Sequence, residues 1–201
     1  LKKAITLVNE NQQFYDRRVE EYGNSYLTLN WGSKNSQELR FDILSQIGDL
    51  NNKSVLDFGC GLGHFYKWFY EKSINVNYTG IDISLKMINK AKSLFPNQNF
   101  KKYDIFAYPL EQEFDYILLS GVFTYTNQEF FEQCIKNLFD KCKIGVGFNL
   151  LSKWGKTSEY IEENEFLSCP KNILKFCKTL SLRSVLKKNY HPRDFTIFIY
   201  K

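Results

Sequence analysis

The sequence lacks the features that would place this chain in several broad classes of protein. It has five cysteines but no Cys-x-x-Cys pair, and no Cys/His cluster has the spacing of a zinc site. No stretch approaches the roughly eighteen apolar residues of a membrane span, and the basic N-terminus lacks the apolar core of a signal peptide. We therefore expect a cytoplasmic protein with reduced cysteines, no metal and no membrane span.

The sequence also lacks clustered charge, internal repeats and low-complexity linkers. Its 27 Lys and Arg exceed its 22 Asp and Glu to give a net charge of +5, but the lysines are scattered and gather only in pairs such as Lys101-Lys102. A nucleic-acid-binding surface needs a concentrated basic patch. The pattern favours a solvated surface and no nucleic-acid partner.

Hydrophobic residues make up 43% of the 201 residues, which is ample for the core of one α/β domain. Strand and helix patterns alternate along the chain, which predicts an open, mostly parallel, doubly wound sheet. The expected strands are 54–58, 77–83, 98–104, 114–121 and 143–151, and the expected helices are 36–50, 62–73, 84–95 and 127–142. Ser84 is the expected N-cap of the helix 84–95.

The two ends of the chain follow different patterns. Residues 180–190 and 195–201 read as two strands joined by a short turn, which predicts an antiparallel hairpin. We expect residues 1–35 to form a helical N-terminal lid over a domain of residues 36–201. The segment 152–170 has no strong periodicity and is interpreted as an insertion over the same face.

A glycine-rich turn with an acid in front of it follows the first strand. The sequence DFGCGLGH places Asp57 two residues before Gly59, with Gly61 and Gly63 after it, and His64 stands where a dinucleotide fingerprint would have glycine. Asp57 would repel a diphosphate but attract a cation. S-Adenosylmethionine carries a sulfonium and an ammonium and no phosphate, while the helix N-terminus offers N–H groups to its carboxylate. The acid therefore favours a cationic ligand of this kind.

The ends of the later strands supply the other parts of such a site. Asp82 suits the two ribose hydroxyls, although NAD sites share this feature. Asp104 can accept from the adenine amino group. Further residues expected around the cofactor are Ile83, Met87, Ile105, Ser120, Gly121 and Phe123.

The motifs VLDFGCGLG, GIDIS, the Tyr-Asp of 103–104 and FDYILLSGVF, in this order and spacing, resemble the class I S-adenosylmethionine-dependent methyltransferases over residues 36–201. The resemblance implies a Rossmann-like, seven-stranded sheet with an antiparallel last strand. It is greatest to small-molecule methyltransferases of ubiquinone and menaquinone biosynthesis and of sugar or capsule modification. In that group an arginine before the first strand contacts the methionine carboxylate, which implies this role for Arg40 and a covering role for Trp31.

Two signatures of other methyltransferases are missing. No NPPY-like tetrapeptide follows the fourth strand, which argues against adenine, cytosine or glutamine amides as acceptors. No cysteine has the proline-cysteine context of 5-methylcytosine enzymes. Both absences favour a small-molecule acceptor.

Candidate acceptor-side residues lie at the expected ligand edge of the sheet, each with a plainer alternative. His191 is the candidate general base, or else a solvent-exposed turn residue. Arg193 can hold an anionic group of the acceptor, or pair with Asp194 on the surface. Other candidates for substrate binding are Tyr15, Tyr26, Tyr125 and Asn149, with packing or capping as the alternative role.

The sequence thus predicts methyl transfer from S-adenosylmethionine to oxygen or nitrogen of a small acceptor, such as a sugar precursor, a phosphorylated metabolite or a quinone-like ring. Arg193 and the net positive charge favour an anionic acceptor. The alternatives are a non-catalytic cofactor-binding module, an NAD-dependent oxidoreductase, and aminopropyl transfer from the decarboxylated cofactor.

Overall fold

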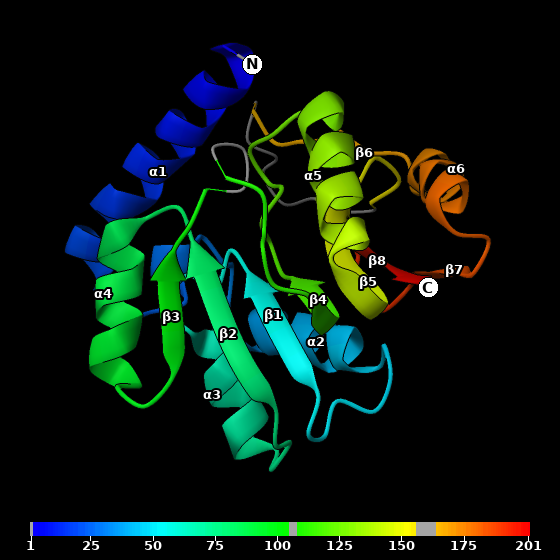
Figure 1. Ribbon diagram of the computed structural model, residues 1–201. Coiled ribbons are helices and arrows are strands. Elements are labelled where there is room, and N and C mark those ends of the chain that lie inside the picture. The colour runs from blue at the N-terminus through cyan, green and yellow to red at the C-terminus, as the bar shows by residue number, and fades with distance from the viewer. Residues whose placement is uncertain (1, 105–107, 156–163) are drawn as a thin grey trace.

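The computed structural model describes residues 2–104, 108–155 and 164–201. Its centre is one eight-stranded sheet (Figure 1), in which seven strands run in the order β3-β2-β1-β4-β5-β8-β7 and β6 pairs with β5. The strands are β1 (Ser54–Phe58), β2 (Asn77–Asp82), β3 (Asn99–Lys102), β4 (Phe114–Leu119), β5 (Cys142–Ser152), β6 (Leu167–Ser168), β7 (Ser184–Lys187) and β8 (Asp194–Tyr200).

The strand directions confirm the predicted topology. β1 pairs in parallel with β2 and β4, and the parallel arrangement continues to β3 and β5. β8 is antiparallel to β5 and to β7. The carboxyl ends of β1 to β5 and of β7 therefore meet at one edge of the sheet, as expected of a doubly wound fold.

Helices cover both faces of the sheet. They are α1 (Lys2–Tyr22), α2 (Lys34–Ser45), α3 (His64–Glu71), α4 (Leu85–Leu94), α5 (Gln128–Asp140) and α6 (Pro170–Leu180), with a 3-10 turn η1 (Leu27–Leu29). Successive apolar residues in the central strands alternate between two cores. Leu56 of β1 packs in the core under α5 and α6, and Val55 packs in the core with α2, α3 and α4. Strands buried on both faces read as continuous apolar runs in the sequence.

Helix α1 lies across the carboxyl ends of β2 and β3, above α4 (Figure 1). Two polar contacts hold it there: Ser84 Oγ donates to Asp16, and Lys86 pairs with Glu20. Ser84 is fully buried and also caps α4, because its Oγ accepts from Met87 N–H at 3.0 Å. The expected helical segment at the N-terminus is thus present, and its standing as a separate lid domain stays a prediction.

Helix α6 and the two-residue strand β6 were not predicted from the sequence, because no helix or strand was expected between 152 and 180. Pro170 occupies the first turn, and Ile173 and Cys177 bury a stripe against the core. The expected strand 180–190 is correspondingly shorter. Residues 156–163 of the predicted insertion lie outside the described residues.

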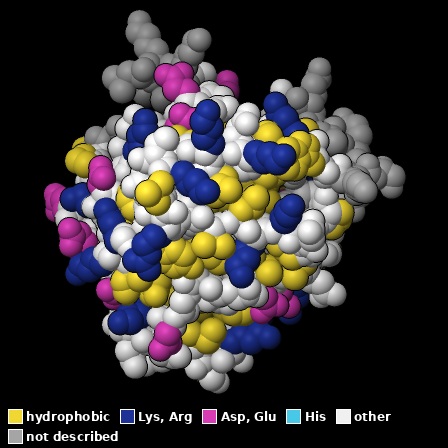
Figure 2. All heavy atoms as spheres, turned by 90° about the vertical axis from the view of Figure 1, so that its right-hand side faces the viewer, with side chains coloured by type: hydrophobic (Ala, Val, Ile, Leu, Met, Phe, Trp, Pro, Cys, Tyr) yellow, Lys and Arg dark blue, Asp and Glu magenta, His cyan; other side chains and the backbone are white. Residues whose placement is uncertain are grey.

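One side of the molecule carries more basic than acidic side chains. Figure 2 shows the side formed by α6 and β7, where Lys and Arg side chains spread over the face and Asp and Glu lie mainly at its margins. Among the described residues, no helix has both the length and the apolar character required to cross a membrane.

Candidate functional site

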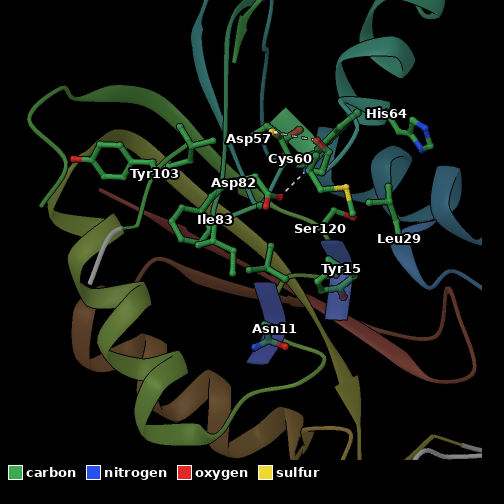
Figure 3. Close-up of a pocket in the computed structure, with 18 of the residues that line it drawn as sticks. Asn11, Tyr15, Leu29, Asp57, Cys60, His64, Asp82, Ile83, Tyr103 and Ser120 are labelled. Atoms are coloured by element: carbon green, nitrogen blue, oxygen red, sulfur yellow. Dashed lines mark hydrogen bonds between the residues drawn. The ribbon is translucent and has the colours of Figure 1, made fainter. Parts of the chain in front are cut away.

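A pocket opens at the carboxyl ends of β1, β2 and β4, beneath α1. About 1050 Å³ of space not filled by atoms lies within it and at its mouth, a volume that includes open solvent. Figure 3 shows Asn11 and Tyr15 of α1 on the side of the pocket facing Asp57 and Asp82 of the strand ends. The pocket lies at the sheet edge where doubly wound folds bind ligands.

The glycine turn after β1 forms one wall. Gly59, Gly61 and Gly63 have φ angles of 72°, 52° and 76°, in the left-handed region that favours glycine. At Gly61 a Cβ would also lie 2.5 Å from a methyl carbon of Leu29. Gly59 and Gly61 line the pocket, and Gly63 caps the N-terminus of α3.

Asp57 lines the pocket from β1 and is only 2% exposed. Its Oδ2 accepts a hydrogen bond from the Tyr78 hydroxyl at 2.7 Å. Burial raises the pKa of Asp57 to about 7, and the Tyr78 hydrogen bond opposes part of that rise. A ligand that brings positive charge to this carboxyl would favour its ionised form.

Asp82 lines the pocket from the end of β2. Its two carboxylate oxygens accept from the backbone N–H groups of Gly61, at 2.9 Å, and Ser84, at 2.8 Å. The pKa of Asp82 is raised to about 6. Burial causes the rise, and the hydrogen bonds from the Ser84 and Gly61 backbones limit it because they favour the ionised carboxylate. Each oxygen retains a lone pair, so the carboxylate can accept two further hydrogen bonds from a ligand.

The charge of the pocket has one sign. Asp57, Asp82 and Asp104 line it, and no Lys or Arg does so among the described residues. A diphosphate would meet uncompensated carboxylates here, whereas a cation would find them favourable. The pocket is therefore suited to a cationic ligand.

His64 also lines the pocket, at the start of α3. Its ring nitrogens lie 3.3 Å from Gln37 Oε1 and 3.0 Å from Asn24 Oδ1. Burial, aided by Lys67 and Lys34, lowers the pKa of His64 to about 4. This histidine is neutral at pH 7 and does not offset the acidic charge.

The segment after β4 completes the wall. Ser120 Oγ is buried and has no hydrogen-bond partner among the described residues. Gly121 N–H donates to Asn149 Oδ1 at 2.9 Å, and a Cβ at Gly121 would lie 2.7 Å from the Trp31 ring. A buried hydroxyl on the pocket wall marks a point at which a polar ligand can bond.

Comparison with known proteins agrees with this geometry. The family model described as "Methyltransferase domain" matches residues 55–145, from β1 to β5. A Mycobacterium tuberculosis protein, named as a methyltransferase with no acceptor specified, is 26% identical over 156 residues, covering 74% of this chain and 93% of that protein.

Residues 55–145 form a methyltransferase domain, and the chain is similar along most of its length to known methyltransferases.

One further sequence relative and one solved structure show how far the similarity extends along the chain. The malonyl-[acyl-carrier protein] O-methyltransferase of Hamiltonella defensa is 29% identical over 142 residues, covering 66% of this chain but only 54% of that enzyme. The magnesium protoporphyrin IX methyltransferase of Synechocystis, crystallised with S-adenosylhomocysteine, superposes with a TM-score of 0.71 over 96% of this chain and 99% of its own. At 15% identity this superposition shows the shared fold.

The predicted cofactor residues divide between the pocket wall and positions behind it. Those that line the pocket are Trp31, Asp57, Gly59, Gly61, Asp82, Ile83, Met87, Asp104, Ser120 and Gly121. Phe123 is buried in the core against Phe131 and lines a smaller adjoining cavity. Ile105 lies outside the described residues.

Arg40 lies behind Trp31 and does not line the main pocket of the methyltransferase. Its guanidinium carbon is 4.6 Å from the centroid of the Trp31 ring, and its Nε pairs with Asp194 Oδ2. Both side chains of this ion pair are at least 95% buried, at 5% and 1% exposure. The assignment of Arg40 to the methionine carboxylate stays a prediction.

His191 packs on the same ion pair. Its Nδ1 accepts from the Arg193 backbone N–H at 3.1 Å, and its Nε2 lies 3.4 Å from Ser36 Oγ. Nδ1 also lies 3.7 Å from Asp194 Oδ2. His191 does not line the main pocket, and its assignment as a base stays a prediction.

The predicted substrate residues are also spread over several positions. Tyr15 lines the pocket, and Asn149 lines the adjoining cavity behind Trp31. The Tyr125 hydroxyl accepts from Asn30 at 2.6 Å, Tyr26 precedes η1, and Arg193 pairs with Glu165. Their roles toward a substrate stay predictions.

Several lining residues were missed by sequence reasoning. Asn11, Leu29 and Gln37 come from the N-terminal segment, whose place over the pocket no local pattern reveals. Tyr103 and Cys60 stand within motifs already recognised, next to Asp104 and Gly59, and their position in the motif could have indicated them.

Proposed function

We propose that this methyltransferase transfers the methyl group of S-adenosylmethionine to an oxygen or nitrogen of a small-molecule acceptor, and that the acceptor is anionic. The observation that supports the cofactor site is the charge of the main pocket, which has three carboxylates and no Lys or Arg among its described lining residues. NAD would bring a diphosphate to these carboxylates, which disfavours an oxidoreductase.

The proposed cofactor contacts follow from the donors and acceptors on the pocket wall. Asp82 accepts from the ribose hydroxyls, and Asp57 lies nearest the cationic methionine end. Ile83 and Met87 pack on the adenine, and Asp104 accepts from its amino group. The backbone of Gly59 and Gly61 allows a close approach to the ligand.

Bound S-adenosylmethionine supplies an activated methyl group on a sulfonium centre. The protein positions the acceptor and excludes water. Tyr15 from α1 and Trp31 close the pocket on the side away from the sheet. The unpartnered hydroxyl of Ser120 is available to hold a polar atom on the wall after β4.

An anionic acceptor accords with one relative, the methyltransferase that acts on malonyl-acyl-carrier protein, because a malonyl group carries a carboxylate. A carboxylate acceptor needs no general base, since it is already a nucleophile. A hydroxyl acceptor would need one, and His191 is the proposed base in that case. Arg193 can serve an anionic acceptor only by exchanging its Glu165 partner for the substrate.

The cofactor part of the proposal is tested by calorimetric titration with S-adenosylmethionine, S-adenosylhomocysteine and NAD. We expect the two adenosyl ligands to bind and NAD not to bind. Asp82→Asn should weaken adenosyl binding at least tenfold, because it replaces one hydrogen-bond-accepting oxygen with a donor. Asp140→Asn, at an exposed carboxyl at the end of α5, is the matched control and should bind like wild type.

The acceptor part needs a separate measurement. Methyl release from labelled cofactor is followed over a panel of small carboxylates, phosphates, phenols and amines. Turnover confined to amines or neutral phenols would contradict the anionic assignment while leaving the methyltransferase activity intact. With an anionic acceptor in hand, Arg193→Gln should raise KM for it with little change in cofactor affinity.

A further inference from the structure

The segment of residues 166–201 carries a large excess of basic over acidic residues. Between residues 166 and 201 there are eight Lys and Arg and a single acid, Asp194, for a net charge of +7. The whole chain has +5, so the preceding residues have −2. Asp194 is buried against Arg40 and cannot offset this charge at the surface.

Seven of these cations belong to α6, β7, the residues on either side of β7 and the residue after β8, elements that pack together at the β7 end of the sheet. We name this surface the C-terminal basic face, and it consists of Lys171, Lys175, Lys178, Arg183, Lys187, Lys188 and Lys201. Six of the seven are exposed, and Lys187 is half-buried. The three lysines of α6 recur at spacings of four and three residues, so they share the helix face opposite the buried Ile173 and Cys177.

Apolar side chains are exposed among these cations. Leu182 is 86% exposed, Trp154 50% and Val185 42%. The Lys171 ammonium lies 5.5 Å from the centroid of the Trp154 ring. Figure 2 shows this side of the molecule, with apolar side chains between the Lys and Arg side chains.

Strand β7 adds a third feature, because it is the end strand of the sheet. It pairs with β8 alone among the described residues. One edge of β7 therefore presents backbone N–H and C=O groups with no strand beside them, next to Leu182 and Val185. Such an edge can accept an extended segment of another chain.

We propose that the C-terminal basic face docks an acidic protein, whose carboxylates meet the lysines and whose apolar side chains meet Leu182, Val185 and Trp154. A protein partner fits better than a nucleic acid, because apolar side chains stand among the cations and protein–DNA interfaces are more polar. A lipid surface fits less well, because the apolar stripe of α6 faces the core and is not free to insert. The proposal is independent of which acceptor is methylated.

The experiment measures binding of a fluorescent peptide that alternates Glu with Val, by anisotropy, to the purified chain. We expect saturable binding that weakens as salt is raised, since the contacts are between exposed charges. A peptide that alternates Lys with Val should not bind. Duplex DNA and phosphatidylserine vesicles, titrated in parallel, should bind more weakly than the acidic peptide.

Three variants locate the contact. Lys171→Glu/Lys175→Glu/Lys178→Glu should weaken peptide binding at least tenfold, and Leu182→Ser/Val185→Thr should weaken it severalfold without changing the charge. Lys92→Glu/Lys101→Glu/Lys102→Glu makes the same charge change near β3, at the opposite edge of the sheet, and should bind like wild type. Far-UV circular dichroism confirms that each variant is folded.

Two kinds of outcome would overturn the proposal. Absent peptide binding, or equal loss in both charge-reversal variants, would mean that the face is merely solvated or that net charge alone is responsible. Tighter binding of DNA or of vesicles, abolished by the α6 variant, would assign the face to that ligand instead.

Discussion

The substitution Asp57→Asn tests how much the ionisation of a buried carboxyl in the pocket destabilises the ligand-free protein. Without a ligand, this buried carboxyl opposes folding when it ionises, since burial raises its pKa from an ordinary 3.8 to about 7. Asparagine keeps an oxygen for the Tyr78 hydroxyl and carries no charge. We therefore expect the variant to be more stable than the ligand-free wild type at high pH, and to bind the cofactor less well.

The magnitude follows from proton linkage. Below the unfolded pKa of Asp57 both states are protonated, and between that value and about 7 the folded state holds a proton that the unfolded state has lost. The contribution of Asp57 to wild-type stability therefore falls as pH rises through this window, by about 1.4 kcal/mol per pH unit. The stability advantage of Asp57→Asn should widen by about 2.7 kcal/mol between roughly pH 5 and pH 8.

The assay is urea unfolding of both proteins across this pH range, followed by tryptophan fluorescence. The difference between the two proteins cancels the titration of groups that they share. Asp140→Asn is again the matched control, and its difference from wild type should stay flat with pH. A constant difference for Asp57→Asn across the range would refute the assigned burial cost, and so would an advantage that shrinks as pH rises.

Three further results are expected. The dissociation constant of S-adenosylmethionine, measured by calorimetry, should rise about tenfold per pH unit below pH 7, because Asp57 must lose its proton to face the cation. Gly61→Ala should cost about 1–2 kcal/mol in urea unfolding, from its left-handed backbone and the displaced Leu29, and should weaken cofactor binding. Asp194→Asn should cost about 3–5 kcal/mol in urea unfolding by leaving Arg40 buried without a counter-charge, and Arg40→Met/Asp194→Asn should recover most of that loss.

Local patterns were enough to predict most of the fold. Strand β1 was predicted at its observed bounds, and β2, β4 and β5 within two residues, because continuous apolar runs with turn signals identify buried strands. Ser84 was correctly predicted to cap α4. Helix α6 was missed although Pro170 and the spacing of Ile173 and Cys177 mark a helix. The segments before and after α6 lack a clear helical or strand periodicity, so the start of the helix was not recognised.

The sequence predicted those residues of the candidate site whose place is set by the end of a strand. Asp57 and Asp82 meet because parallel strands end at one edge of the sheet, and the sequence shows where each strand ends. The ion pair of Arg40 with Asp194 joins residues far apart in the chain, and no local signal foretells it. The same holds for the bond between Gly121 and Asn149, which depends on the register of the loops after β4 and β5.

The position of β8 in the sheet has a consequence for synthesis on the ribosome. β8 lies between β5 and β7, although β7 precedes it in the chain. During translation β7 therefore emerges before the strand that joins it to the sheet. Until β8 emerges, β7 has no strand to pair with, and the edge of β5 that will bind β8 is unpaired. Asp194 begins β8, so the counter-charge of Arg40, which lies against Trp31 of the pocket wall, is synthesised after β1 to β7. We expect ligand binding to appear on nascent chains only after residues 194–200 have left the exit tunnel.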